Sequence, residues 1–201
     1  LIRQKDYLLK EVNHRVQNSL QLVSAFLRLQ AKSATDTQSR THLDEAQRRL
    51  TAVALVHRRL YQDESVEVID LSRYLEDLCL EMKLTIDEGW SDQIEINLAP
   101  ILVATDRAVN IGLILTELMI NANKYAYDGR PGPLSIDLEQ HRASLRLIVS
   151  DKGAGKVAGE SDRFGFGSRM VNAIVERLGG NIEEEDNHPG LRTVVTAPVQ
   201  V

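Results

Sequence analysis

The sequence has one cysteine, few aromatic residues and no long apolar run among its 201 residues. Its single thiol, Cys79, cannot build a disulfide framework or a cysteine-rich metal site, which fits a reducing, cytoplasmic environment. No segment reaches the roughly 20 consecutive apolar residues of a membrane-spanning helix, and the first residues resemble neither a signal peptide nor a natural start. We therefore expect a fragment of a longer protein that makes no membrane contact of its own.

The net charge of −5 is divided unevenly along the chain. Residues 1–62 carry 11 Lys and Arg against 5 Asp and Glu, a net of +6, whereas residues 63–201 carry 13 against 24, a net of −11. The basic residues are scattered and have few aromatic side chains between them, so the sequence predicts no nucleic-acid binding. Solvated helix faces or an acidic protein partner would account for the basic segment.

Within the first 61 residues, the apolar side chains recur at the spacing of amphipathic helices. A polar stretch at residues 32–39 separates two such patterns, which predicts an antiparallel helical hairpin. The stripe of the first helix, predicted over residues 5–31, consists of Leu9, Val16, Leu20, Val23 and Leu27. Two helices with one stripe each cannot enclose a core, so we expect a homodimer whose hairpins form a four-helix bundle. We predict that residues 1–64 form this domain.

Residues 65–201 are predicted to form a second domain of the α+β class. Its helices and an antiparallel-rich sheet indicate a two-layer α/β sandwich. The expected helices span residues 71–86, 106–125 and 168–178, and the expected strands span residues 94–98, 134–138, 145–149, 181–185 and 192–197.

A first polar motif lies on the helix predicted over residues 106–125. Glu117, Asn121 and Lys124 are spaced i, i+4, i+7, so a carboxylate, an amide and an ammonium share one helical face. This combination suits a magnesium–polyphosphate site.

Two glycine motifs follow. Asp151 ends an apolar strand, where its carboxylate can accept a hydrogen bond from an exocyclic amine, and Gly153 and Gly155 allow the backbone to approach a flat base. Gly165 and Gly167 precede a helix whose free N–H groups favour phosphate. Each motif alone is common in ordinary turns, but their order and spacing are specific. The phosphate loop G-x-x-x-x-G-K-[ST] is absent.

In this order, the three motifs resemble the N box and the two glycine boxes of the ATPase superfamily shared by histidine kinases, type II topoisomerases, ninety-kilodalton heat-shock chaperones and MutL mismatch-repair proteins. Residues 8–21 read LLKEVNHRVQNSLQ and are similar to the H-R-x-x-N phosphoacceptor motif of the histidine kinases. His14 lies about 200° around the helix from Val16, off the apolar stripe, so we expect it to be exposed.

The resemblance implies a sensor histidine kinase core that uses ATP and Mg²⁺ to phosphorylate His14 and passes the phosphoryl group to an aspartate in the receiver domain of a response regulator. Asn121 would hold Mg²⁺ through the ATP phosphates, and Asp151 would read adenine. Residues 156–164 would act as a short lid, and a sensory domain would precede Leu1. The implied residues are His14, Arg15, Asn18 and Glu117 for catalysis, and Asn121, Lys124, Tyr125, Asp151, Gly153, Gly155, Gly165, Gly167 and Thr193 for ATP binding.

The sequence departs from the family pattern at two places. Where many relatives have Gly-Thr near the last strand, Gly190 is followed by Leu191; Thr193 has the same strand parity and can take the role of the threonine. Asn13 and Ser19 replace a histidine and an asparagine of the phosphoacceptor motif.

Two alternative functions remain open. One is a phosphotransfer or phosphatase scaffold that keeps His14 but turns over ATP poorly; the intact Asn121, Asp151 and glycine motifs favour the kinase. The other is an anti-sigma serine kinase of the same superfamily, which does not need the hairpin that carries His14.

Overall fold

The computed structural model describes residues 2–61, 68–86, 92–154 and 166–199. The chain divides into two compact units, Leu1–Val66 and Glu67–Val201. Helices alone form the first unit and a sheet with helices forms the second, so the predicted α+β class is confirmed. Within the described ranges, no helix combines the length and the apolar character needed to cross a bilayer.

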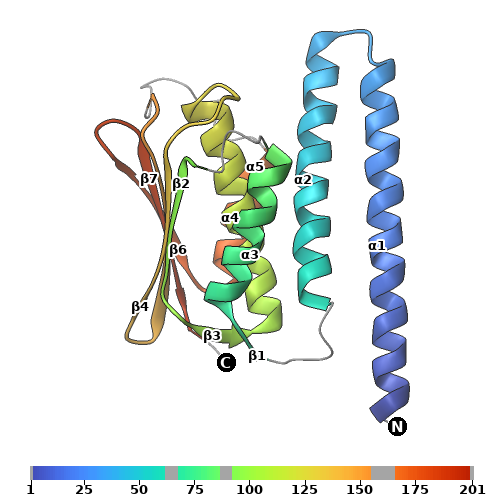
Figure 1. The fold of residues 1–201 in the computed structure, drawn as a ribbon, viewed down its shortest axis with the longest axis horizontal. Coiled ribbons are helices and arrows are strands. Elements are labelled where there is room, and N and C mark those ends of the chain that lie inside the picture. The colour runs from blue at the N-terminus through green and yellow to red at the C-terminus, as the bar shows by residue number, and fades with distance from the viewer. Residues whose placement is uncertain (1, 62–67, 87–91, 155–165, 200–201) are drawn as a thin grey trace. The chain divides into compact units, whose positions relative to one another are not determined.

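The first unit is an antiparallel hairpin of α1 (Ile2–Ser33) and α2 (Thr37–Tyr61) (Figure 1). The connection is shorter than the polar stretch of residues 32–39 predicted from the sequence. Asp36 begins α2 early because its carboxylate accepts a 2.7 Å hydrogen bond from the Ser39 N–H, an N-cap interaction that also holds the pKa of Asp36 below its usual value.

The apolar stripe of α1 is only partly covered. Val16, Leu20 and Leu27 of the stripe are half-buried, whereas Val23 is 47% exposed. Beside the stripe, Leu22 is 72% exposed and Phe26 57%. A shallow groove on α1 is lined by Val12, Arg15, Val16, Ser19, Leu20 and Val23. A single hairpin therefore leaves apolar surface on α1 in contact with water.

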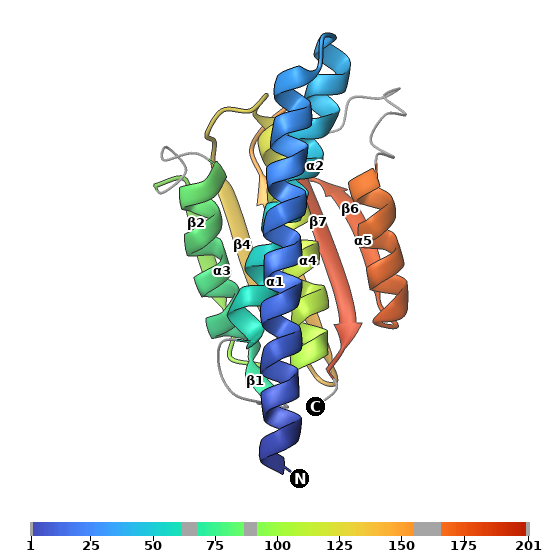
Figure 2. The same cartoon turned by 90° about the vertical axis from the view of Figure 1, so that its right-hand side faces the viewer.

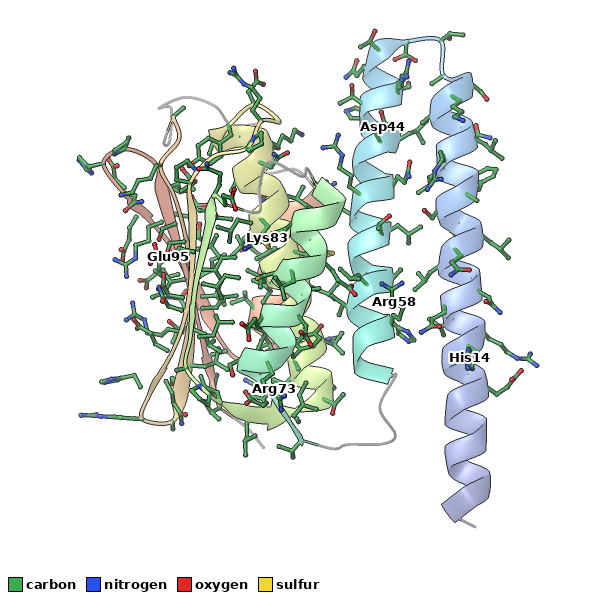
Figure 3. All side chains as sticks on the ribbon, viewed as in Figure 1. His14, Asp44, Arg58, Arg73, Lys83 and Glu95 are labelled. Atoms are coloured by element: carbon green, nitrogen blue, oxygen red, sulfur yellow. The ribbon has the colours of Figure 1, made fainter. Side chains whose placement is uncertain are left out.

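The second unit is a two-layer sandwich. Its five-stranded sheet has the order β2-β4-β5-β7-β6, in which only the β2–β4 pair is parallel. Three helices cover one face (Figure 2), and Glu95 lies on the other (Figure 3). The strands are β2 (Ile94–Leu98), β4 (Leu134–His141), β5 (Ser144–Asp151), β6 (Asn181–Asp186) and β7 (Leu191–Pro198); the helices are α3 (Leu71–Ile86), α4 (Thr105–Asn121) and α5 (Phe166–Arg177).

The core lies between these two layers. Leu138, Leu147 and Val195 stand side by side on neighbouring strands, and all three are at most 2% exposed. On β4, Leu138 alternates with the polar Asp137 and Glu139, which is the pattern of a sheet with one buried face; on β5 and β7, Ile148 and Val194 on the other face are buried as well.

A small second sheet was not predicted from the sequence. Strands β1 (Val68–Asp70) and β3 (Leu102–Ala104) pair in antiparallel fashion. Strands of three residues are too short to show an alternating pattern. The Asp70 carboxylate then accepts a hydrogen bond of 3.0 Å from the Ser72 N–H at the start of α3.

The helix predicted over residues 106–125 is present, but its last turn is π-helical, which the sequence did not predict. Helix α4 stops at Asn121, and a π-helical turn, η2 (Ala122–Ala126), follows. A π turn changes the hydrogen-bond spacing from i→i+4 to i→i+5, so the residues after Asn121 no longer continue the α-helical faces. Turns of this kind are frequent at functional sites.

Candidate functional site

A cavity in the second unit is built from five elements: α4 with its π turn, β5, α5, β6 and β7. Its walls are mostly apolar, with a few polar groups among them, which is the usual composition of a site for a small organic ligand. The lining residues are Leu118, Asn121, Ala122, Tyr125, Ala126, Val149, Asp151, Ser168, Glu184, Leu191 and Thr193.

Asp151 is a buried, hydrogen-bonded polar group of the cavity. It ends β5 and is 7% exposed. Its Oδ1 atom accepts hydrogen bonds from the backbone N–H groups of Gly153 at 3.0 Å and Leu191 at 3.1 Å. Both bonds go to the same oxygen, so within the described ranges Oδ2 keeps its acceptor capacity for a ligand in the cavity.

Gly153 allows the turn after Asp151 to pack against η2. A Cβ at Gly153 would lie 2.3 Å from the carbonyl oxygen of Ala126, which is too close for any side chain. The glycine therefore brings the backbone next to Asp151 against the π turn that lines the cavity. This close approach fits a flat ligand held between the turn and the apolar walls.

Of the first polar motif, Glu117, Asn121 and Lys124, only Asn121 lines the cavity. Asn121 and Tyr125 line it. Glu117 is 2% exposed and is not among the lining residues, and the Lys124 Nζ atom lies 4.9 Å from the centre of the Tyr125 ring. Because the π turn begins after Asn121, Lys124 does not follow the α-helical spacing on which the sequence prediction rested.

Strand β7 contributes Leu191 and Thr193, which both line the cavity. They lie two residues apart on one strand face, in agreement with the parity expected from the sequence. Glu184 of β6, which was not predicted as a site residue, pairs in register with Thr193 and also lines the cavity. Strand periodicity could have predicted this position, because Ile182 is the apolar residue of β6 and Glu184, two residues later, lies on the same face.

The second glycine motif is described only in part. Gly167 is buried in the first turn of α5, and the next residue, Ser168, lines the cavity. Gly155, Gly165 and the predicted lid at residues 156–164 lie outside the described residues.

For a metal ion, Asn121 offers an amide oxygen at the cavity wall. One such ligand suits Mg²⁺, which usually keeps phosphate and water ligands. Elsewhere in the described part of the chain, no group of three or more His, Cys, Asp or Glu side chains is arranged to hold a metal ion.

The phosphoacceptor segment lies on α1, where Figure 3 labels His14. His14 is exposed, as expected from its position off the apolar stripe, and so is Asn18. The Arg15 Nε atom donates a 2.8 Å hydrogen bond to Glu11, one turn earlier. The imidazole is thus accessible to a reactant, with a cation and an amide on the same segment.

Two family profiles match the chain. One, described as histidine kinase, covers residues 11–86, and the other, described as histidine kinase-like ATPase domain, covers residues 85–195. The first match includes α3, which the structure places in the second unit.

Curated relatives agree with these profiles. The chain is 33% identical over 201 residues to the sensor histidine kinase PdtaS of Mycolicibacterium smegmatis, covering 95% of this chain and 39% of the relative. It is 28% identical over 191 residues to blue-light-activated histidine kinase 2 of Erythrobacter litoralis, covering 88% of this chain and 53% of the relative. The chain therefore spans about two fifths to one half of the length of these relatives.

A solved structure shows the same fold. The histidine kinase domain of a blue-light activated histidine kinase from Erythrobacter litoralis superposes with a TM-score of 0.65 at 24% identity, over 98% of this chain and 96% of that chain.

Proposed function

The chain belongs to the histidine kinase family, and from this premise we propose that it binds ATP in the cavity of its second unit and transfers the γ-phosphoryl group to His14. In this proposal, residues 65–201 are the ATP-binding catalytic domain and residues 1–64 carry the phosphoacceptor and the dimer contacts. The observation that carries the proposal is the environment of Asp151.

The Asp151 carboxylate can select a base that carries an amino group. Its Oδ1 atom is occupied by two backbone N–H groups, so its orientation is fixed and Oδ2 is the remaining acceptor. The exocyclic amine of adenine is a donor that matches this acceptor, and Leu118, Val149 and Leu191 supply apolar surface for the ring. Thr193 adds a hydroxyl on the neighbouring strand.

In this proposal, the phosphates of the nucleotide lie between the end of α4 and the start of α5. Asn121 would bind Mg²⁺ together with the ATP phosphates, and Glu117 and Lys124 would shape the phosphate side of the site. The first turn of α5, which contains Gly167 and Ser168, presents backbone N–H groups that favour an anion. Mg²⁺, when bound, neutralises phosphate charge, while these residues position the nucleotide.

The transfer itself exchanges one bond for another. A nitrogen of the His14 imidazole forms a bond to the γ-phosphorus while the bond from phosphorus to the bridging oxygen of ADP breaks, and ADP leaves with that electron pair. The ring proton is released to the solvent. Arg15 and Asn18, on the same segment of α1, would stabilise the transferred charge.

We further propose that two copies of the hairpin pair through α1 and that the phosphoryl group passes to an aspartate of a receiver domain. The exposed apolar residues of α1 and the heptad spacing suit a second hairpin. The net charge of +6 on residues 1–62 complements an acidic receiver pocket. A light-scattering mass of one chain at micromolar concentration would exclude the dimer.

Radiolabelling tests the kinase proposal. The chain is incubated with γ-labelled ATP and Mg²⁺, and the protein-bound label is tested for lability in acid and stability in base. We expect such label on the wild type and on His42→Ala, a matched control because His42 is also an exposed histidine of the hairpin. We expect none on His14→Ala, and a strong reduction on Asn121→Ala.

The outcomes separate the kinase from the scaffold. Label that survives His14→Ala would show that the acceptor assignment is wrong. If the wild type takes no label from ATP but accepts phosphate at His14 from a phosphorylated receiver domain, the chain is a phosphotransfer scaffold and the kinase proposal fails.

A further inference from the structure

We propose that Asn187, in the turn between β6 and β7, is a positioning residue that holds Asp151 for recognition of the nucleotide base. This inference rests on the proposed function, because it concerns how the same cavity selects adenine. Asn187 belongs to none of the motifs that carry the family resemblance. It follows Asp151 by 36 residues and reaches it only through the folding of the β6–β7 hairpin.

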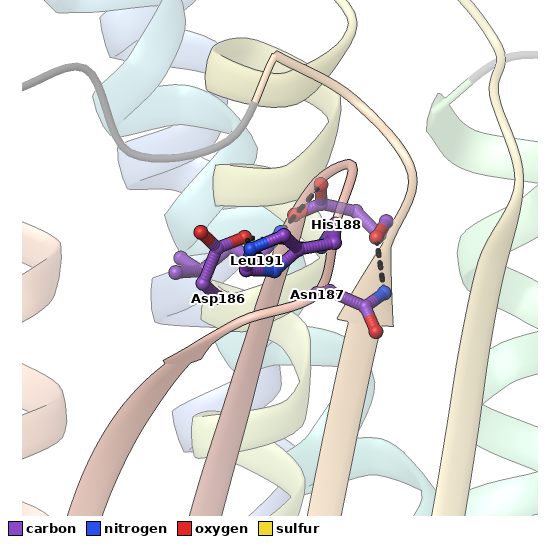
Figure 4. A network of polar contacts seen from close by, with 5 residues as sticks. Asp186, Asn187, His188 and Leu191 are labelled. Atoms are coloured by element: carbon purple, nitrogen blue, oxygen red, sulfur yellow. Dashed lines mark hydrogen bonds and ion pairs between the residues drawn. The ribbon is translucent and has the colours of Figure 1, made fainter.

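Three features of this turn, of which Figure 4 labels Asp186, Asn187, His188 and Leu191, converge on Asp151. The Asn187 Nδ2 atom donates a 2.7 Å hydrogen bond to the main-chain oxygen of Asp151. The Leu191 N–H donates to Oδ1 of the same residue at 3.1 Å. Gly190 lies against the peptide of Asp151, because a Cβ at Gly190 would be 2.0 Å from the Asp151 carbonyl oxygen.

The turn is held by its own contacts. The Asn187 N–H donates to the Gly190 carbonyl oxygen at 3.1 Å. The His188 N–H donates to Asp186 Oδ1 at 3.0 Å, and the His188 Nδ1 atom lies 2.9 Å from the same oxygen. Gly190 has a φ of +106°, a backbone conformation that other residues rarely adopt. The Asn187 side chain therefore extends from a fixed turn.

These contacts hold both the main chain and the side chain of Asp151. Asn187 fixes the main-chain oxygen and Leu191 fixes one carboxylate oxygen, so the direction of the remaining oxygen, Oδ2, is determined. The N–H of the same peptide, that of Lys152, donates to the Tyr127 hydroxyl at 2.8 Å, so without the Asn187 amide the peptide is held by a hydrogen bond on one side only, and its carbonyl oxygen and the attached carboxylate can shift. A carboxylate with several orientations would bind an amino group more weakly and distinguish it less well from a carbonyl oxygen.

The test compares ATP with inosine triphosphate, in which a carbonyl oxygen replaces the 6-amino group. Nucleotide affinities are measured by calorimetry on the 201-residue chain with Mg²⁺. We expect Asn187→Ala to weaken ATP binding roughly five-fold, the value of one net hydrogen bond. The affinity for inosine triphosphate should fall less than two-fold, so the preference for ATP becomes smaller. A general loosening of the fold would weaken both nucleotides equally.

Two further variants guard against a folding defect. Asn187→Asp keeps the side-chain shape but replaces the donor with a carboxylate that faces the Asp151 carbonyl oxygen. The preference of this variant for ATP over inosine triphosphate should therefore be smaller than that of Asn187→Ala. Asn181→Ala is the matched control, because Asn181 begins β6, the strand that leads into the turn, and its side-chain hydrogen bond goes to the exposed Glu183. This control should keep the wild-type preference, and thermal unfolding is followed for each variant.

The results distinguish this inference from the proposed function. If Asp151→Asn abolishes the preference for ATP while Asn187→Ala and Asn187→Asp leave it intact, Asp151 reads the base without help from Asn187 and the inference is overturned. Equal losses for the two nucleotides would also overturn it. If Asp151→Asn binds both nucleotides as the wild type does, the proposed site itself is wrong.

Discussion

Replacing Gly153 by alanine should weaken ATP binding, because the turn after Asp151 has no room for a side chain. The added Cβ would lie 2.3 Å from the carbonyl oxygen of Ala126 and 2.5 Å from its Cβ. Real Cβ atoms do not approach other atoms more closely than 3.0 Å, so the turn and η2 must separate by at least 0.7 Å, the difference between 3.0 and 2.3 Å. The nearest atom belongs to the backbone and cannot rotate away.

The expected size of the effect follows from this overlap. Inserting a methyl group into a closely packed site costs about 1–3 kcal/mol. If the close approach of the turn to η2 is required for binding, that cost raises the Kd for ATP roughly five- to 150-fold, at about 1.4 kcal/mol for each factor of ten. Tyr125 and Asp151 would move apart on opposite sides of the cavity.

Calorimetric titration of the variant with ATP measures this change, and thermal unfolding reports any loss of stability. Ala154→Ser, at the exposed neighbouring position, should keep the Kd within two-fold. Adding Ala126→Gly to Gly153→Ala should not restore binding, since the carbonyl oxygen remains. A Gly153→Ala variant with wild-type affinity and stability would refute the steric argument.

Two further perturbations concern stability. Arg107→Met removes the 2.8 Å hydrogen bond from the buried guanidinium to the Leu178 carbonyl oxygen just after α5. This variant should lower the free energy of unfolding by about 1–3 kcal/mol in urea titrations. As a control, Arg73→Met, at an exposed arginine, should change it by less than about 0.5 kcal/mol. Burial raises the pKa of the Cys79 thiol from 9.0 to about 12. A folded-state pKa above the unfolded value means that stability is intact below pH 9 and falls as pH rises toward 12. Cys79→Ala should therefore lose less stability than the wild type over this range, and equal pH profiles in urea titrations would contradict the assignment.

The local periodicity of the sequence determined most of the secondary structure. The apolar spacing located the three helices of the second unit's sandwich, and the alternation of Leu145, Leu147 and Val149 located a central strand, although Ile148 on its other face is buried as well. The π-helical turn after α4 was not predicted, because an α-helix and a π turn place similar demands on composition. The difference lies in packing, since the turn after Asp151 lies against Ala126.

The sequence by itself determined which chemical groups this protein has available: an exposed imidazole at His14, a carboxylate at the end of a buried strand, and glycines where the backbone must approach another group. Side-chain type and spacing suffice for that, because they act within one helix or one strand. Only the tertiary structure decided that Glu184 lines the cavity and that Asn187 holds Asp151. The contacts to Asp151 join residues 36 and 40 positions apart, and like the Glu184–Thr193 pair they depend on strand register, which local propensity does not encode.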